Sequence, residues 1–407
     1  MIKSVFRNKQ IILGVSGGIA AYKSVELLRL LVKQDASVRV LMTKNACRFV
    51  GQTTFEALSD NRVCTSLFEN NDSPISHIEW AQMADAVVIA PATANIIGKF
   101  ANGIADDALS TFLLAVTAPT MFCPAMNTNM YESAPVQRNL ERLRTDGYIV
   151  LEPGSGELAC KTSGAGRLPD PEIIVDRLGA CMTPKDLKGV RFVVTAGPTR
   201  ESIDPVRFIT NPSSGKMGYA IARAAEKRGA FVTLVSGPTN LSDPLNMNVI
   251  RVQSAAQMAE AVFAHADKAH VIVKSAAVAD YRPKETAEHK VKKTEGDTVL
   301  HFERTVDILK ELGRRKKDQI LVGFAAETRE LKEYAQKKLV QKNLDMIVGN
   351  LVNQPSSGFG TNTNQVTLFS KDGTVDNFPL MSKDNVADIL LDRIAEKLVK
   401  RSAEPEK

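Results

Sequence analysis

The sequence predicts an α/β protein with two doubly wound, mostly parallel Rossmann-like domains, the first of them flavodoxin-like. Three observations lead to this fold class. Short apolar runs rich in β-branched residues alternate with helical stretches along the chain. The runs lack polar alternation, which is typical of strands buried on both faces of a parallel sheet. The pattern also stops and restarts once within 407 residues, a length that suits two domains.

The first half contains five candidate strands, and helical stretches separate them. In chain order they are residues 11–15, 38–42, 86–90, 120–123 and 148–151. A helix that joins two parallel strands crosses over the sheet and covers one of its faces. We therefore expect one doubly wound domain over residues 1–187.

A break rich in Pro, Gly and Lys, residues 183–189, precedes a fresh apolar run that starts at Arg191. This composition is typical of a linker between domains. We place the boundary at residue 187, so the second domain covers 188–407. Its candidate strands are residues 191–195, 231–235, 271–275, 320–324, 346–349 and 365–369.

Composition and charge narrow the possible partners. The net charge of +6 is modest, and the basic residues are dispersed apart from short runs at 290–293 and 314–317. Nucleic-acid binders usually concentrate such charge on one face, so we expect anionic small molecules and no nucleic acid. No apolar stretch suits a membrane span or a signal peptide. Five cysteines without a CxxC pair favour a reducing compartment, so we expect a cytoplasmic protein with no membrane partner.

A glycine-containing turn follows the first candidate strand and opens a helix. Around Ser16, Gly17 and Gly18 the backbone N–H groups can approach an anion at the positive end of that helix, which predicts a phosphate site. The turn is not a strict GxGxxG and lacks the lysine of a Walker motif. A tight turn without a ligand is the alternative.

Polar residues also follow two later strands. Thr93, Ala94 and Asn95 come after the strand at 86–90, and Ala125 and Asn127 come after the strand at 120–123. In open α/β sheets the carboxyl ends of the strands form the ligand crevice. We expect these residues to share one crevice, although either asparagine could serve only a turn.

Two further residues of the first half carry chemistry. His77 is its only histidine, and a lone histidine is more often a surface or capping residue. Cys160 lies in a glycine-rich stretch, residues 154–166, that is too long for a simple connector and is typical of a lid. A surface loop with an incidental cysteine is the alternative.

In this order, these motifs resemble the flavin-dependent cysteine decarboxylases, which include phosphopantothenoylcysteine decarboxylase and the peptidyl-cysteine decarboxylases of lantibiotic synthesis. The resemblance implies FMN as the cofactor. It also implies two groups of flavin contacts. The phosphate and ribityl side would be held by Ser16, Gly17, Gly18 and Thr43, and the flavin would be bordered by Thr93, Ala94, Asn95 and Ala125.

The same resemblance implies the catalytic roles. Asn127 would bind the substrate carboxylate, and His77 would act as base while FMN oxidises the substrate thiol to a thioaldehyde. Decarboxylation then leaves a carbanion that is delocalised onto sulfur. Cys160 would protonate the resulting enethiolate as the reduced flavin returns its electrons, which requires a thiol pKa near the working pH.

The second half offers groups suited to acyl and phosphoryl chemistry. Arg207 and Asn211 present a guanidinium fork and an amide for a carboxylate or a tetrahedral acyl intermediate, although Arg207 could also form a surface ion pair. Lys338 and Lys342 share one helix face. Together with the lysines at 290–293 they suit a triphosphate, but solvated lysines would show the same pattern.

The segments 196–201, 204–218, 276–281 and 323–328, taken with these lysines, resemble phosphopantothenate–cysteine ligase, the synthetase half of a bacterial bifunctional enzyme of coenzyme A biosynthesis. The fused order, decarboxylase then synthetase, is the same. The resemblance implies that CTP and Mg²⁺ activate 4′-phosphopantothenate as an acyl-cytidylate, which the amine of cysteine then attacks. It further implies a homo-oligomer with a trimer-based decarboxylase core and dimeric ligase domains.

By this resemblance Asn211 would stabilise the acyl intermediate with Arg207 beside it, and Lys290 would assist the second step. Asp280 is the candidate Mg²⁺ ligand. The family has a proline where this chain has Val306, a small departure because that contact is mainly with the backbone. The nucleotide would be held by Lys274, Ser275, Ala276, Asp280, Lys290, Val306, Asp307, Ile308, Leu309, Phe324, Lys338 and Lys342.

Two other functions fit parts of the pattern. A non-catalytic FMN-binding regulatory subunit would tolerate the loss of His77 or Cys160, yet both are present. A nicotinamide-dependent oxidoreductase would have a strict GxGxxG and an acidic residue at the end of its second strand, where this chain has Met42 and Thr43.

Overall fold

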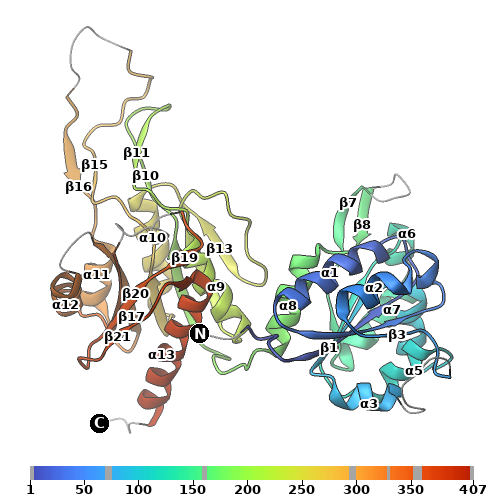
Figure 1. The fold of residues 1–407 in the computed structure, drawn as a ribbon. Coiled ribbons are helices and arrows are strands. Elements are labelled where there is room, and N and C mark those ends of the chain that lie inside the picture. Colours follow the sequence, from blue (N-terminus) through green and yellow to red (C-terminus); the bar gives the residue numbers. More distant parts are fainter. Residues whose placement is uncertain are drawn as a thin grey trace. The chain divides into compact units, whose positions relative to one another are not determined.

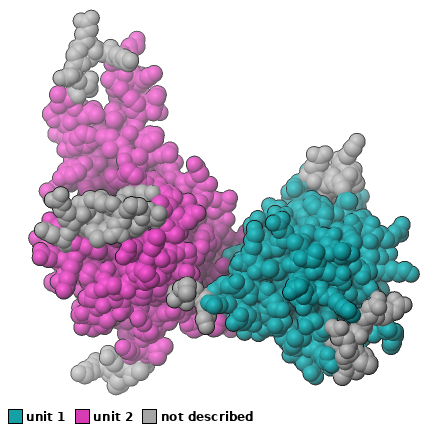
Figure 2. All heavy atoms as spheres, in the orientation of Figure 1, with its two compact units in different colours: residues 1–183 teal, residues 184–407 magenta. Residues whose placement is uncertain are grey.

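The structure is a computed structural model of the 407-residue chain, and it describes residues 4–68, 76–157, 163–292, 299–327, 331–351 and 360–403. The chain divides into two compact units, Met1–Thr183 and Pro184–Lys407 (Figure 2). The division falls inside the Pro- and Lys-containing break that precedes Arg191.

The first unit is built on a six-stranded sheet in which every pair of neighbouring strands is parallel. Its strands are β1 (Gln10–Val15), β2 (Ser37–Met42), β3 (Val63–Cys64), β4 (Ala86–Ala92), β5 (Thr120–Pro124) and β6 (Ile149–Val150), in the order β3-β2-β1-β4-β5-β6. All five predicted strands are present. Without β3, which was not predicted, their order is the flavodoxin order 2-1-3-4-5. The two-residue β3 extends this sheet at one edge.

Helices cover both faces of this sheet, as Figure 1 shows. One face packs through Ile11 and Leu13 against α1 and α8, and the other packs through Ile12 against α4, α5 and α7. This confirms the doubly wound class. The helices are α1 (Ala21–Lys33), α2 (Gln52–Ser59), α3 (Ser76–Met83), α4 (Ala94–Ala101), α5 (Ala108–Ala115), α6 (Thr128–Glu132), α7 (Ala134–Thr145) and α8 (Pro171–Met182), with a 3-10 turn, η1, at Ala46–Arg48.

A hairpin stands apart from the sheet of the first unit. Its strands are β7 (Gly154–Glu157) and β8 (Ser163–Arg167), which pair antiparallel. Residues 158–162, between them, lie outside the described part of the chain. The backbone N–H of Met126 donates to the carbonyl of Gly166 at 3.0 Å, so β8 is attached to the loop that follows β5.

The second unit has an eight-stranded sheet, in which six strands are parallel and the last two antiparallel. Its strands are, in spatial order, β13 (Asn248–Arg251), β12 (Phe231–Ser236), β9 (Arg191–Ala196), β14 (Val271–Lys274), β17 (Ile320–Glu327), β18 (Met346–Leu351), β20 (Val366–Ser370) and β21 (Val375–Asn377). The prediction of a second, mostly parallel Rossmann-like domain is confirmed. Every strand predicted for this half is present.

Helices again cover both faces. One face packs against α9 and α13, and the other against α10, α11 and α12. The helices are α9 (Lys216–Lys227), α10 (Ala255–Ala266), α11 (Ile308–Arg315), α12 (Leu331–Gln341) and α13 (Lys383–Ala403). Small antiparallel pairs complete the unit: β10 (Arg200–Ser202) with β11 (Phe208–Thr210), β15 (Tyr281–Pro283) with β16 (Phe302–Arg304), and β19 (Thr363–Asn364) with β22 (Met381–Ser382).

Candidate active sites

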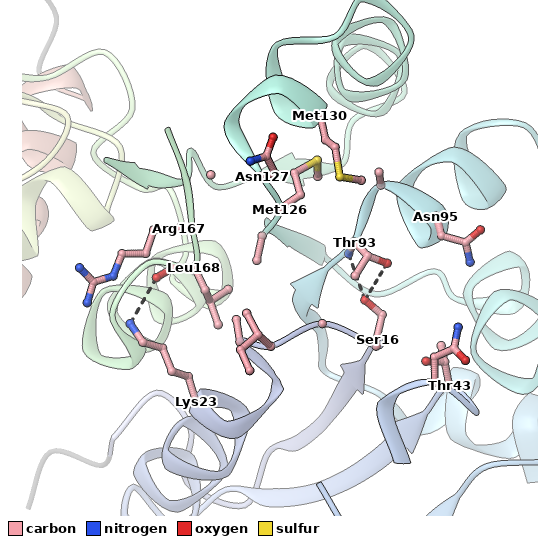
Figure 3. A pocket seen from close by; sticks show the side chains of 18 of the residues that line it. Ser16, Lys23, Thr43, Thr93, Asn95, Met126, Asn127, Met130, Arg167 and Leu168 are labelled. Atoms are coloured by element: carbon pink, nitrogen blue, oxygen red, sulfur yellow. Dashed lines mark hydrogen bonds between the residues drawn. The ribbon is translucent and has the colours of Figure 1, made fainter. Parts of the chain in front are cut away.

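A pocket of about 1170 Å³ opens at the carboxyl ends of β1, β2, β4 and β5 in the first unit (Figure 3). Parallel strands end at the same edge of a sheet, which is why residues far apart in the sequence meet there. The pocket gathers nine of the residues predicted to form the flavin and substrate site. They are Ser16, Gly17, Gly18, Thr43, Thr93, Ala94, Asn95, Ala125 and Asn127.

Ser16 ties the ends of β1 and β4 together. Its side chain is 1% exposed, and its Oγ donates to the carbonyl of Pro91 at 2.7 Å. The same Oγ accepts a hydrogen bond from the backbone N–H of Thr93 at 3.0 Å and lies 3.1 Å from Oγ1 of Thr93 (Figure 3). Ser16 therefore fixes the relative positions of two walls of the pocket.

The glycine turn after β1 is crowded on one side. A Cβ on Gly17 would clash with Cβ of Asn45 and lie 2.8 Å from the carbonyl carbon of Asn45. A Cβ on Gly18 would meet nothing closer than Cγ2 of Thr93, at 3.5 Å. Gly17 is thus required for the close approach of this turn to the segment after β2, whereas Gly18 is not.

The N-terminus of α1 faces this turn without a side-chain cap. Neither its capping position, Ala20, nor an acidic residue in its first turn neutralises the backbone N–H groups there. Uncapped N–H groups and the helix dipole favour an anion at this position. The turn therefore retains the properties of a phosphate site that its sequence predicted.

The residues after β4 and β5 form the opposite wall. Thr93 precedes α4, and Asn127 caps α6 by accepting a hydrogen bond from the backbone N–H of Asn129 at 2.9 Å. This bond uses the amide oxygen of Asn127. Figure 3 shows Asn127 with Met126 and Met130 at one side of the pocket. The asparagine thus has the structural role in a turn that was the alternative, and it still lines the pocket.

The two other residues predicted for decarboxylation are Cys160 and His77. Cys160 lies outside the described residues. His77 is in the first turn of α3, which packs against α5, and it does not line the pocket. Among the described residues the Nδ1 of His77 is buried and has no hydrogen-bond partner. The structure of one chain therefore does not bring His77 to the predicted site.

Five charged residues that line the pocket were not predicted for this site. They are Lys23, Lys44, Lys99, Asp107 and Arg167. Lys99 pairs with Asp106 at 2.6 Å and with Asp107 at 2.8 Å, and these hydrogen bonds raise the pKa of its amine. Lys44 follows the predicted Thr43 at the end of β2, whereas no sequence motif marks the other four residues, because they come from helices and from a hairpin whose positions depend on tertiary packing.

In the second unit, the carboxyl ends of β9 and β14 are joined by side chains. Oγ1 of Thr195 and Oγ1 of Thr199 accept hydrogen bonds from the backbone of Ala276 and Ala279, both at 3.0 Å. Asn211 donates from its amide to the carbonyl of Val278 at 3.1 Å. The predicted acyl-binding residue, Asn211, and the predicted nucleotide segment therefore lie side by side.

Arg207 is held in an ion pair. Its Nε and Nη2 donate to Oδ2 of Asp204 at 2.9 and 2.6 Å, and Nη2 also donates to the carbonyl of Val291 at 3.1 Å. Asp204 is buried and accepts in addition from the backbone N–H of Val291 at 3.2 Å. These charge-assisted bonds hold the pKa of Asp204 well below its usual range, the bond to Arg207 being the largest cause. The pair connects the Arg207 turn to the loop that carries Lys290.

Several of the predicted nucleotide residues form a charged cluster. Lys342 pairs with Asp307 at 2.8 Å, and charges at Lys342, Asp307, Asp280 and Lys338 all act on Lys274. Burial and then the nearby Lys342 lower the pKa of Lys274 to about 8, while Asp307 and Asp280 oppose the shift. Cations from β14 and α12 are thus gathered in one place, as a triphosphate requires.

The apolar nucleotide residues differ in accessibility. The side chains of Ile308 and Leu309 are buried in the core, so only their backbone at the start of α11 is available to a ligand. Val306 is exposed, and Phe324 is half-buried on β17. Ser275 and Ala276 follow β14 directly. That Ile308 and Leu309 hold the nucleotide stays a prediction, and such a contact would be made by their backbone.

Asp280 is the residue predicted to bind Mg²⁺. In the described ranges, no group of three or more His, Cys, Asp or Glu residues is arranged to hold a metal ion. Asp280, the predicted ligand, is exposed at the end of the loop after β14.

Known proteins match this chain over nearly its whole length. Residues 3–182 match the family model described as Flavoprotein, and residues 187–398 match the DNA/pantothenate metabolism flavoprotein C-terminal domain. The coenzyme A biosynthesis bifunctional protein CoaBC of Bacillus subtilis is 53% identical over 396 residues, which cover 96% of this chain and 98% of the relative. The chain belongs to this family. The family predicted from the ordered motifs is therefore confirmed, and the chain combines a decarboxylase and a ligase.

Other members of the family are similarly close. The CoaBC protein of Escherichia coli K12 is 45% identical over 392 residues, covering 95% of this chain and 96% of the relative. The solved C-terminal domain of a CoaBC protein is 50% identical with a TM-score of 0.47, and it covers 53% of this chain and 99% of that chain. A PPC decarboxylase mutant complexed with pantothenoylaminoethenethiol is 30% identical with a TM-score of 0.38, and it covers 42% of this chain and 96% of that chain.

None of the helices in the described part of the chain combines the length and the apolar character that crossing a membrane requires.

Proposed function

We propose that residues 188–407 ligate cysteine to 4′-phosphopantothenate with CTP and Mg²⁺, and that residues 1–187 decarboxylate the product to 4′-phosphopantetheine with FMN. The observation that carries this proposal is the pocket of the first unit, which collects nine predicted flavin and substrate residues at one sheet edge. A nucleotide-binding cluster at the corresponding edge of the second unit supports the other half.

The residues of the pocket fit FMN. The pocket has a volume of about 1170 Å³, above the roughly 300–1,000 Å³ of ordinary small-molecule sites, so a flavin and a substrate can share it. The uncapped N-terminus of α1 and the close approach at Gly17 suit the phosphate. When bound, FMN supplies the oxidation of the substrate thiol and later returns the electrons.

The protein residues then bind and orient the substrate. Asn127 would hold the carboxylate that leaves as CO₂, because it lines the pocket and its side-chain oxygen is fixed by the backbone N–H of Asn129. Met126 and Met130 supply apolar surface at the same wall and exclude water from the developing carbanion. Cys160 would donate the final proton.

We further propose that the decarboxylase forms trimers with the flavin at subunit contacts. Ile19, Tyr22 and Met130 are large apolar residues at the pocket, yet 64%, 61% and 49% of their surface is exposed. Apolar surface of this kind is typical of an interface. In such an assembly His77 of one copy would serve the pocket of another, consistent with its position outside the pocket of its own chain.

The ligase would use the groups at the ends of β9 and β14. Asn211 would stabilise the acyl intermediate, and Arg207 would position the loop that carries Lys290. Lys274, Lys338 and Lys342 would hold the triphosphate, and Asp280 would supply a carboxylate ligand to the Mg²⁺ that offsets its charge. Apolar residues exposed on the hairpins, Phe208, Tyr281 and Phe302 among them, support a dimer of this unit.

We also propose a cytoplasmic location. In the described part of the chain Cys47, Cys64, Cys123 and Cys181 form no disulfide, as expected in a reducing compartment.

The test is incubation of purified protein with 4′-phosphopantothenate, cysteine, Mg²⁺ and either CTP or ATP, followed by mass detection of 4′-phosphopantetheine. Product is expected with CTP, from yellow protein that releases FMN on denaturation. Product with ATP but not with CTP would contradict CTP as the proposed nucleotide. Absence of product with both nucleotides would contradict the two reactions.

A further inference from the structure

Charged side chains line the decarboxylase pocket, and most of them are neutralised. Lys23 pairs with Asp170 at 3.1 Å, and Lys99 pairs with Asp106 and Asp107. Two lining cations, Lys44 and Arg167, have no ion-pair or hydrogen-bond partner in the described part of the chain. An unpaired cation in a ligand pocket is available to an anion of the ligand.

The two unpaired cations belong to different ends of the pocket. Lys44 lies between Thr43 and Asn45, beside the glycine turn that suits the phosphate of FMN. Arg167 ends β8, and Figure 3 shows it on the side opposite Thr43. One cation is therefore near the flavin phosphate, and the other is left for a second anion.

Arg167 is held in place by its surroundings. The neighbouring Gly166 accepts a hydrogen bond from the backbone N–H of Met126 at 3.0 Å, and the amine of Lys23 donates to the carbonyl of Leu168 at 3.5 Å. The guanidinium extends along the hairpin, where a Cβ on Gly156 would lie 3.7 Å from Nη1. The chain on both sides of Arg167 is thus anchored to the pocket wall, while its guanidinium stays unpaired.

The proposed substrate supplies two anions of its own. Its cysteine carboxylate reacts at Asn127, and its 4′-phosphate lies at the far end of the pantothenoyl chain. The planar fork of an arginine matches phosphate oxygens in a bidentate arrangement. We infer that Arg167 binds the 4′-phosphate of 4′-phosphopantothenoylcysteine and makes the decarboxylase selective for phosphorylated substrate. This inference rests on the decarboxylase function proposed above.

The test compares 4′-phosphopantothenoylcysteine with pantothenoylcysteine, which lacks only the phosphate. Arg167→Met is expected to lower the ratio of the two kcat/KM values by about 10- to 100-fold, the range expected for a lost charge-assisted bond. Arg167→Lys should retain part of the selectivity, because it keeps the charge without the fork. The matched control is Arg29→Met, an exposed arginine of α1 outside the pocket, for which the ratio should stay at the wild-type value.

A second measurement does not depend on turnover of the dephosphorylated substrate. In the unaltered protein 4′-phosphopantetheine should inhibit more strongly than pantetheine. In Arg167→Met the inhibition constants of these two products should be equal. The flavin absorbance spectrum shows whether the FMN site is intact in each variant.

Equal losses on both substrates would overturn the inference, because they would assign Arg167 to the fold or to the carboxylate. An unchanged ratio would overturn it as well. Failure of the wild-type protein to decarboxylate either substrate would contradict the proposed function instead, so the two failures are distinguishable.

Discussion

At the scale of single residues, Gly17 allows the close approach of the glycine turn to the segment after β2. A methyl group there would overlap Asn45, and overpacking of this kind costs about 1–3 kcal/mol. Gly17→Ala is therefore expected to weaken FMN binding by about tenfold or more. Gly18→Ala is the matched control, because its Cβ has room, and it should retain the flavin. Titration of apo-protein with FMN, followed by flavin fluorescence, checks both variants, and equal affinities would contradict the close approach.

If Lys274 holds the triphosphate as proposed, the ligase should depend on pH. Its pKa is lowered to about 8, chiefly by burial and then by Lys342, so its amine loses its proton as the pH rises from 7 to 9. The neutral amine no longer attracts phosphate. The KM for CTP should therefore rise about tenfold over this range, the ratio of the protonated fractions at the two pH values.

The control for this prediction is Lys274→Gln. It should give a high KM for CTP that changes little between pH 7 and 9, because no titrating amine remains. A wild-type KM that stays constant over this range, measured by pyrophosphate release, would contradict a role for Lys274 in nucleotide binding.

At the scale of elements, the ion pair of Asp204 and Arg207 joins two loops of the ligase. Asp204→Asn keeps the shape but removes the charge that holds Arg207 and the backbone of Val291. Ligase turnover should fall by about tenfold or more, since the charge-assisted hydrogen bonds that position Arg207 are lost, while decarboxylation of supplied 4′-phosphopantothenoylcysteine stays unchanged. Separate assays of the two steps measure this, and loss of both activities would indicate misfolding instead.

The main strands could be predicted because both faces of each are buried. Runs such as residues 86–90 contain no polar position, so a strand of a parallel sheet could be predicted from these residues without knowing their distant contacts. By contrast, β3 has two residues, and the hairpin β10–β11 has three in each strand. Such short strands carry too little periodicity to be recognised and form because the surrounding fold positions them.

The candidate sites could be predicted where they follow strand ends, as Thr93 and Ala125 do. Lys99 and Asp107 lie on α4 and at the start of α5, and Arg167 ends a hairpin, so only tertiary packing brings them to the pocket. The partner of Arg207 depends on a local turn, in which Asp204 accepts from the backbone of Val206 and Arg207. The alternative for Arg207 was a surface ion pair. Arg207 does form an ion pair, although its partner, Asp204, is buried.

At the scale of the whole molecule, the two units have separate hydrophobic cores. Calorimetry should therefore show two unfolding transitions. Removal of FMN should lower the midpoint of one transition, and addition of CTP with Mg²⁺ should raise the midpoint of the other, because each ligand stabilises only the unit that binds it. A single transition that responds equally to both ligands would contradict independent units.

The central claim is that one chain makes and then decarboxylates the same intermediate. Its most direct test follows pyrophosphate and CO₂ together, with cysteine labelled at its carboxylate carbon, 4′-phosphopantothenate, CTP and Mg²⁺. The account predicts one labelled CO₂ for each pyrophosphate, none of either from Asn211→Ala, and pyrophosphate without CO₂ from Asn127→Ala. Release of CO₂ in the absence of CTP, or pyrophosphate without CO₂ from the unaltered protein, would contradict it.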